Sequence, residues 1–361
     1  MEKFKHEYSQ SVSQPLMGVD PTDREVEIPS LPRDMLEKIK AAEVKLDTSF
    51  PEEHFLLSKE EVDLLSIGDL AFIKGKQKQG KTMALKVIVA ALLGDETFGF
   101  KAMIRGIRVC YIDSEQNARD TQVFLTTVKD MVPEEDAVKQ LKVFNLREHL
   151  PKEQNEIMRG ILELYRPDVL VIDNLLDLVP KFMDQESYQG IKDIMALSTK
   201  YHCCIISVMH TNKSSFDDNM PGMCGTAAAR KAEIVMKCEM DEGTVLVETT
   251  DSRHAPVPDW GFRVGEDGAI EPLAIEALRK LRQRQMSRNE ERIPRALDMV
   301  REMASDEGLV ERKQLKERLR VEFQIGETTA KQLIKQMIGE HYLTEEGLRG
   351  AMLRLKDTLR D

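Results

Sequence analysis

Long apolar segments are missing from this sequence. No run approaches the roughly twenty apolar residues that a membrane-spanning helix requires. The first residues, MEKFKHEYSQSVSQ, carry charges with no apolar stretch behind them, so we expect no export signal. With 41% hydrophobic and 32% charged residues in 361 positions, the composition indicates a soluble, cytoplasmic protein of two domains with tails.

Paired cysteines and an excess of positive charge are missing as well. The five cysteines are odd in number and lie mostly in apolar stretches, which favours reduced, buried thiols. His202 beside Cys203 and Cys204 is a weak metal signal, because adjacent strand residues point to opposite faces. The net charge of −11 excludes a generally basic nucleic-acid coat but leaves room for a local basic groove.

The most informative stretch is residues 71–93, AFIKGKQKQGKTMALKVIVAALL. It predicts a short apolar strand, a loop, and an amphipathic helix that opens at Thr82. The loop, residues 75–82, fits G-x-x-x-x-G-K-[ST] at every fixed position, so it predicts a phosphate-binding loop for ATP and Mg²⁺. The predicted nucleotide-binding residues are Gly75, Lys76, Gln77, Lys78, Gln79, Gly80, Lys81, Thr82 and Met83.

The residue types in this loop match the chemistry of a triphosphate. Side chains at Gly75 and Gly80 would obstruct the main-chain N–H groups that must approach phosphate oxygens. The helix that follows directs unpaired amides and the positive end of its dipole at the anion. Lys81 is expected to reach the β- and γ-phosphates, and the Thr82 hydroxyl to ligate magnesium.

Apolar runs and helical segments alternate after the loop. Continuous apolar strands separated by helices predict an α/β fold with a mostly parallel, twisted sheet covered on both faces. A hairpin with its turn at 241–243 is expected to close the sheet. The expected strands are 108–113, 141–145, 168–173, 203–209, 234–238 and 244–250, and the expected helices are 117–131, 152–165 and 186–201.

Polar residues at the ends of these strands are the candidate catalytic groups. The strand DVLVID ends in Asp173, which would hold magnesium through water beside the loop. Glu115 follows the strand VCYID and is expected to polarise the attacking water; Asp113 competes for this role, and either residue could instead cap the next helix. His210 ends the strand CCIISVM, where it could contact the γ-phosphate or be a solvated strand end.

Taken together, these motifs resemble those of the RecA-like P-loop ATPases. The likeness covers residues 55–264 and is strongest to the branch with the hexameric plasmid replicative helicase RepA, with a more distant likeness to RadA and DnaB-type helicases. It also rests on HTNK at 210–213 and on CGT at 224–226 leading into AEI at 232–234. Thr226 and Glu233 are conservative departures from the family's serine and aspartate. The resemblance implies that Glu115 is catalytic and that His210 is a γ-phosphate sensor.

The resemblance also implies an arginine that acts in a neighbouring subunit. The stretch TTDSRHAP at 249–256 puts Arg253 in this position, although Asp251 replaces the family's lysine. An active site between subunits requires a homo-oligomer, which the resemblance implies is a hexameric ring. DNA contacts in the family come from loops that correspond to 180–189 and 213–223, which could equally be ordinary surface loops. Their candidate contact residues are Lys181, Phe182, Tyr188, Lys213 and Phe216.

The flanking segments predict an arm and a second domain. Residues 1–50 are polar and proline-broken with one helix at 33–46, followed by an ATPase domain at 51–272 and a basic helical linker at 273–291. Residues 292–361 predict three helices and a hairpin, the order of a winged helix-turn-helix, with a recognition helix near 327–335. This module could bind DNA or make subunit contacts. The residues that would line its DNA-reading side are Thr328, Thr329, Lys331, Gln332 and Lys335.

The leading functional hypothesis is an ATP-hydrolysing, DNA-dependent motor, a helicase or replication protein of a plasmid or mobile element. Two alternatives from other classes stay open. One is a regulatory, KaiC-like ATPase that switches with nucleotide and binds a protein partner. The other is a site-specific DNA-binding regulator or excision accessory.

Overall fold

The computed structural model describes residues 31–49, 54–178, 185–211, 220, 222–265, 268–290, 292–323, 327–347 and 350–356. The chain divides into two compact units, Met1–Glu52 and Glu53–Asp361. In the described part of the first unit, helix α1 (Arg33–Ala42) buries no residue. It is shorter than the predicted helix at 33–46, because Glu43 already has extended backbone.

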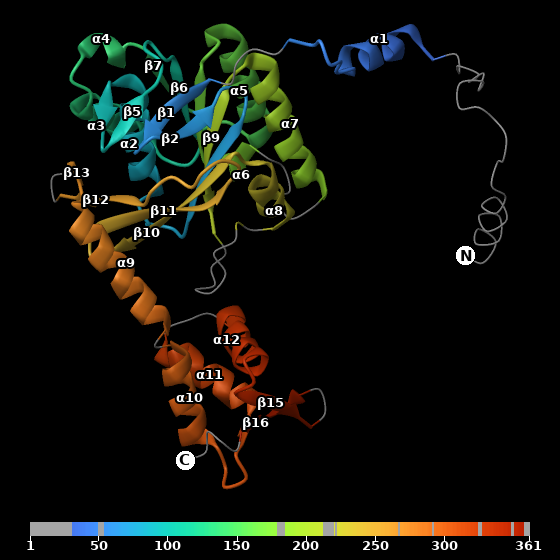
Figure 1. Ribbon diagram of the computed structural model, residues 1–361, viewed down its shortest axis with the longest axis vertical. Helices are drawn as coiled ribbons and strands as arrows, with labels where there is room; N and C mark the ends of the chain where they lie inside the picture. Colours follow the sequence, from blue (N-terminus) through green and yellow to red (C-terminus); the bar gives the residue numbers. More distant parts are fainter. Residues whose placement is uncertain are drawn as a thin grey trace. The chain divides into compact units, whose positions relative to one another are not determined.

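A large sheet forms the core of the second unit (Figure 1). The strands from β10 to β7 in the sheet order run parallel, and β11, β12 and β13 add antiparallel pairs at one edge. The predicted α/β fold with a mostly parallel sheet is confirmed. In sheet order the described strands are β13 (Ile270–Pro272), β12 (Trp260–Val264), β11 (Thr244–Ser252), β10 (Ile234–Asp241), β3 (Leu70–Gly75), β9 (Cys204–His210), β8 (Val169–Asp173), β6 (Val109–Asp113) and β7 (Leu141–Asn145).

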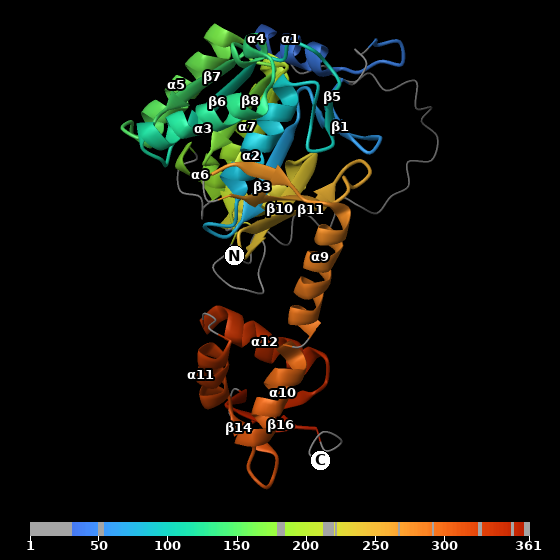
Figure 2. The same ribbon diagram turned by 90° about the vertical axis from the view of Figure 1, so that its left-hand side faces the viewer.

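Helices cover both faces of the sheet, which explains why its strands are apolar throughout (Figure 2). In β3, Ala71 and Ile73 join the core on one face, and Leu70 and Phe72 join the core on the other. The first core contains residues of α2 and α3, and the second contains residues of α5, α6, α7 and α8. The helices are α2 (Lys81–Leu93), α3 (Ala118–Met131), α4 (Glu135–Val138), α5 (Pro151–Tyr165), α6 (Leu175–Leu178), α7 (Gln185–Tyr201) and α8 (Gly222–Lys231).

The prediction that the helix after the phosphate loop is amphipathic is wrong. Every residue of α2 from Ala84 to Leu92 is buried, because a second, small sheet and α3 cover the sides that the main sheet leaves open. This small sheet, in the order β2-β1-β5-β4, lies in a region where we had expected no strands. Its strands are β1 (Phe55–Lys59), β2 (Val62–Ser66), β4 (Glu96–Thr97) and β5 (Phe100–Ala102).

Two segments predicted as loops are partly helical. Helix α7 begins at Gln185, inside the expected loop at 180–189, and α8 begins at Gly222, inside the expected loop at 213–223. Tyr188 therefore lies on α7, where the Lys192 ammonium sits 5.0 Å from its ring centroid. Lys181, Phe182, Lys213 and Phe216 lie outside the described residues.

The C-terminal segment has its own apolar core, built around Val300, Leu315, Leu333 and Leu353. The helices α10, α11 and α12 and the pair β15 and β16 follow the predicted order, while β14 between α10 and α11 was not predicted. The strands pair antiparallel in the order β14-β16-β15. The elements are α9 (Ile275–Glu290), α10 (Arg292–Met303), β14 (Leu309–Glu311), α11 (Arg312–Glu322), α12 (Glu327–Gly339), β15 (Leu343–Glu346) and β16 (Met352–Leu355).

Two expectations from composition can be compared with the structure. All five cysteines are buried and none forms a disulfide. Among the described residues, no helix combines the length and the apolar character needed to cross a membrane.

Candidate active site

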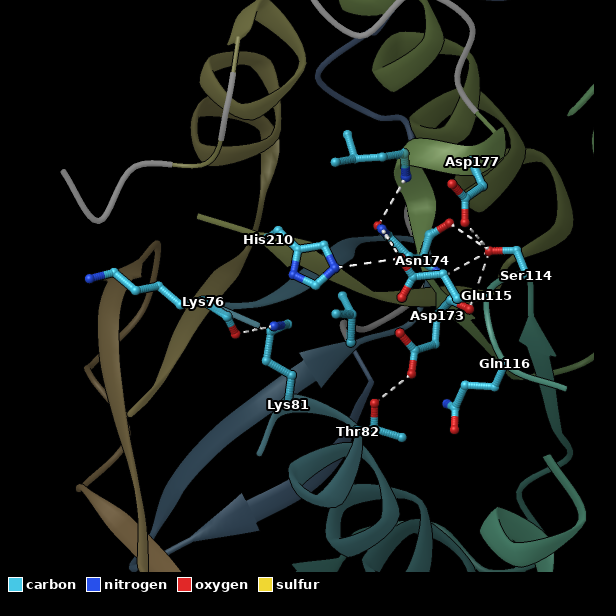
Figure 3. Close-up of polar contacts among 12 residues, drawn as sticks. Lys76, Lys81, Thr82, Ser114, Glu115, Gln116, Asp173, Asn174, Asp177 and His210 are labelled. Atoms are coloured by element: carbon cyan, nitrogen blue, oxygen red, sulfur yellow. Dashed lines mark hydrogen bonds and ion pairs between the residues drawn. The ribbon is translucent and has the colours of Figure 1, made fainter. Parts of the chain in front are cut away.

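The carboxyl ends of four neighbouring strands bring the predicted site residues other than Arg253 together (Figure 3). Gly75 at the end of β3 pairs with His210 at the end of β9, and Asp113 of β6 pairs with Asp173 of β8. Since β3, β9, β8 and β6 are consecutive and parallel, these residues and the loop after β3 share one edge of the sheet. Ligands of α/β proteins bind at this edge.

The phosphate loop packs on the β10–β11 hairpin of the same chain. A Cβ atom at Gly75 would lie 2.7 Å from the Cys238 carbonyl oxygen, and one at Gly80 would lie 2.6 Å from Cγ2 of Val245. Gly80 also has a φ of 81°, in the left-handed region that favours glycine. The side-chain oxygen of Gln79 accepts a hydrogen bond from the Met240 main-chain N–H at 2.5 Å. The packing of the loop on the hairpin therefore requires both glycines.

Lys81 is buried and lies inside the loop. Its ammonium donates hydrogen bonds to the carbonyl oxygens of Gly75 at 2.9 Å and of Lys76 at 2.6 Å. Burial lowers the pKa of Lys81, while Cys238, Asp173 and Glu115 oppose the shift. Its partners are neutral carbonyl oxygens, so a bound phosphate group would give the Lys81 ammonium a negatively charged partner.

Thr82 and Asp173 form a pair of oxygen ligands. The Thr82 hydroxyl donates to Oδ2 of Asp173 at 2.8 Å, and the Tyr111 hydroxyl donates to the same oxygen at 3.3 Å. Burial raises the pKa of Asp173 to about 6, with Asp113 and Glu115 adding to the shift. Hard oxygen donors beside a phosphate loop fit Mg²⁺, and a divalent cation would remove the cost of an ionised carboxylate at this buried position.

The buried charge predicts a measurable effect of Asp173→Asn on stability in metal-free buffer. Because the pKa is higher in the folded state, this group stabilises the fold fully below its ordinary pKa, and that contribution is lost as pH rises through about 6. We expect Asp173→Asn to raise the unfolding free energy by about 3 kcal/mol at pH 7.5 and to change it little at pH 4.

Chemical denaturation at a series of pH values measures this difference. Asp130→Asn, a change of the same type at an exposed position on α3, is the control and should change stability little at either pH. A gain at pH 4 as large as the gain at pH 7.5 would contradict the assignment of a buried, ionised carboxylate.

The two candidate carboxylates have different surroundings. Asp113 is fully buried; its Oδ1 accepts from the main-chain N–H groups of Glu115 and Gln116, and its Oδ2 accepts from the Thr121 hydroxyl. The helix α3 is capped instead by Asn117, whose side chain accepts from the Asp120 N–H at 3.0 Å. Asp113 thus fixes the turn that carries Glu115 and has no oxygen left to face a substrate.

Glu115 faces the open side of this turn. Its side chain is 47% exposed, and its Oε1 lies 3.6 Å from Nε2 of His210. The polar contact with His210 is the main cause of a lowered pKa for Glu115, and burial opposes it. A carboxylate that is ionised, half exposed and next to the phosphate loop can accept a hydrogen bond from a water molecule, so the geometry favours Glu115 over Asp113 as the base.

His210 is positioned by its strand. The next residue, Thr211, donates its N–H to the Gly75 carbonyl oxygen at 3.1 Å, which joins the end of β9 to the start of the phosphate loop. Nδ1 of His210 is buried and has no hydrogen-bond partner among the described residues. The imidazole therefore connects the loop to Glu115 through its other nitrogen.

Arg253 is not part of this cluster. Its Nη1 lies 3.0 Å from Oδ2 of Asp69, and its Nη2 donates to the Lys231 carbonyl oxygen at 2.8 Å. Asp69 precedes the first residue of β3, so Arg253 sits at the amino edge of the sheet, opposite the phosphate loop. The side chain is 47% exposed.

Sequence analysis missed several residues that complete the site. Ser114 and Asn174 follow strand ends, and the rule that carboxyl ends of parallel strands share an edge could have found them. Tyr111, within a strand, and Asp177, on α6, carry no sequence signal for this role. Their contacts with Asp173 and Ser114 appear only in three dimensions.

One protein-family profile matches part of the chain. Residues 38–215 match the sequence profile of a family described as AAA domain, and the matched segment contains the phosphate loop, Glu115, Asp173 and His210. No curated protein matches the chain.

Many solved structures are similar to the chain, and a KaiC-like protein and a RadB recombinase are among them. One is a KaiC-like protein from the hyperthermophilic archaeon Pyrococcus horikoshii OT3, with 12% identity and a TM-score of 0.41 over 58% of this chain and 91% of that chain. The other is a RadB recombinase, with 15% identity and a TM-score of 0.41 over 59% of this chain and 94% of that chain.

Proposed function

We propose that this protein is a RecA-type ATPase that couples ATP hydrolysis to work on DNA. The observation that carries the proposal is the convergence of Lys81, the Thr82–Asp173 pair and Glu115 on one edge of the sheet. These are the groups that phosphoryl transfer to water needs: a cation for the phosphates, oxygen ligands for magnesium and a carboxylate for the water.

Each group has a distinct task in this proposal. The main-chain amides at 75–82 and the start of α2 bind the phosphates, and Lys81 exchanges its carbonyl partners for phosphate oxygens. Thr82 would hold magnesium directly and Asp173 would hold it through water, and the metal would neutralise phosphate charge. Glu115 orients the attacking water, and His210, which touches Glu115, senses the γ-phosphate.

We further propose that a second copy of the chain completes the site. Arg253 is exposed and lies at the sheet edge opposite its own phosphate loop, so it can serve only the loop of another copy. A ring or filament, with a hexameric ring as the leading form, would place each Arg253 beside a neighbouring site. Mixing Lys81→Ala with Arg253→Ala subunits tests this arrangement, because mixed assemblies would regain intact sites and therefore activity.

For the C-terminal module we propose a winged helix that docks on DNA or protein. Within it, Glu327 at the start of α12 lies 2.9 Å from both the Lys316 and the Lys331 ammonium groups, and its hydrogen bonds with Lys316 and Lys331 lower the pKa of Glu327 to about 2. Arg312 pairs with Glu345 in the same way. Basic side chains that are already paired favour the protein-partner alternative, a KaiC-like nucleotide switch, for this part of the chain.

These ion pairs predict the effect of Glu327→Gln on DNA binding. If the module docks on DNA, the change releases Lys316 and Lys331 for phosphates, and we expect affinity for duplex DNA to rise about tenfold at low salt with a steeper salt dependence. Glu340→Gln, at the first residue after α12, is the control, because the Glu340 side chain accepts only from Gln336 in the described structure. Fluorescence anisotropy measures both; equal affinities for Glu327→Gln and Glu340→Gln would favour the protein-partner role.

A further inference from the structure

Two neighbouring turns at the site are joined by hydrogen bonds (Figure 3). The turn after β6 carries Ser114 and Glu115, and the turn after β8 carries Asn174 and leads into α6. The Ser114 N–H donates to the Asp173 carbonyl oxygen at 2.8 Å, and the Asn174 N–H donates to the Ser114 hydroxyl oxygen at 2.9 Å. The Ser114 hydroxyl proton has its shortest acceptor in Oδ2 of Asp177, at 2.7 Å. These bonds make the two turns one unit.

The Asn174 side chain has a defined orientation in this unit. Its Oδ1 accepts from the Leu176 N–H at 3.1 Å, which assigns the oxygen to the α6 side and the amide nitrogen to the opposite side. The nitrogen, Nδ2, lies 3.5 Å from Oε1 of Glu115. Since Asn174 is only 3% exposed, its amide cannot turn away into solvent.

Glu115 thus has two contacts of different kinds at the same oxygen. His210 approaches Oε1 from β9, and Asn174 approaches it from the turn after β8. The imidazole is joined to the phosphate loop through the end of β9, whereas the amide is neutral and is fixed by main-chain contacts within its own turn. The amide is therefore the constant restraint on the carboxylate.

We propose that Asn174 is a positioning residue that aims the Glu115 carboxylate at the attacking water and ties its orientation to α6. This inference rests on the proposed function of Glu115 as the base. Asn174 touches neither phosphate nor water in this scheme. It acts by donating from Nδ2 to Oε1, and the Ser114–Asp177 hydrogen bond keeps its turn in place.

The experiment compares Asn174→Asp and Asn174→Ala with the wild type. Aspartate keeps the acceptor for the Leu176 N–H but replaces the donor to Glu115 with a second negative charge, whereas alanine removes both the donor and that acceptor and adds no charge. We expect the kcat for ATP hydrolysis to fall about thirtyfold in Asn174→Asp and about tenfold in Asn174→Ala, with KM and nucleotide affinity within about twofold. Asn155→Ala on α5, which likewise loses one donor, to the Leu178 carbonyl oxygen, and one acceptor, for Arg159 Nε, is the matched control.

A second readout does not depend on catalysis. Loss of a donor to an ionised carboxylate raises the pKa of that group, and an added negative neighbour raises it further. NMR titration of the Glu115 side-chain carboxyl carbon in nucleotide-free protein measures this pKa, and Glu115→Gln assigns the signal. We expect the pKa of Glu115 to be higher in Asn174→Ala than in the wild type, and higher still in Asn174→Asp. The other charged groups around Glu115, namely Lys81, His210, Asp113, Asp173 and Asp177, are unchanged in both variants.

If the pKa of Glu115 is the same in both variants as in the wild type, the proposal is wrong, whatever happens to kcat. So does a loss of kcat that is matched by an equal loss of nucleotide affinity. If the wild type hydrolyses no ATP, the proposed function fails, and the titration alone still decides whether Asn174 holds Glu115.

Discussion

Replacement of Lys81 by alanine is expected to reduce kcat/KM for ATP by about 10³-fold, because preorganised charge at the phosphates is the largest single contribution to phosphoryl transfer. The fold should survive the change. Burial already disfavours the ammonium, as its lowered pKa shows, and the Gly75 carbonyl oxygen keeps the Thr211 N–H as a donor. Steady-state phosphate release and nucleotide affinity measure the loss.

The neighbouring lysine provides the control for this prediction. Lys76 offers its carbonyl oxygen to Lys81, but its own ammonium points away from Lys81 (Figure 3). Lys76→Ala therefore keeps the contact and should retain activity within a few-fold. Equal losses in Lys76→Ala and Lys81→Ala would mean that the loop binds by general positive charge, and would contradict a specific role for Lys81.

Replacement of Glu115 by glutamine should separate binding from hydrolysis. Glutamine has nearly the same shape and can still contact His210, but it cannot accept a proton, so we expect kcat to fall about 10²- to 10⁴-fold while nucleotide affinity stays within a few-fold. Single-turnover hydrolysis with a separate binding assay measures both quantities.

Asp113→Asn tests the competing carboxylate. This change leaves an oxygen to accept from the N–H groups of Glu115 and Gln116, so it should reduce kcat far less than Glu115→Gln does. A larger loss in Asp113→Asn than in Glu115→Gln would exchange the roles of the two residues.

The pattern of the sequence was sufficient to predict the parallel strands of the main sheet and the residues at their carboxyl ends. Apolar runs such as VLVID are buried on both faces, and the strand ends at Gly75, Asp113, Asp173 and His210 meet at one edge because their strands are parallel. This inference needs only the order of strands and helices. It does not need the details of packing.

Short strands and long-range contacts were beyond the same reasoning. The pair FLLSK and VDLLS is too short and too charged at its turn to stand out as a hairpin, yet it belongs to the small sheet that buries α2. The contact of Asn174 with Glu115 joins two turns that are 59 residues apart. The contact of Arg253 with Asp69 joins residues that are 184 positions apart. Arg253 lies at the amino edge of the sheet because β11 runs antiparallel to β10.

The central claim is that the site hydrolyses ATP with magnesium and that DNA stimulates the reaction. The most direct test is phosphate release by the wild type and by Glu115→Gln, with and without magnesium and single-stranded DNA. We expect magnesium-dependent release by the wild type, faster with DNA, and almost none by Glu115→Gln. Release that needs no magnesium, or that survives in Glu115→Gln, would contradict the site, and release that DNA does not accelerate would contradict the motor.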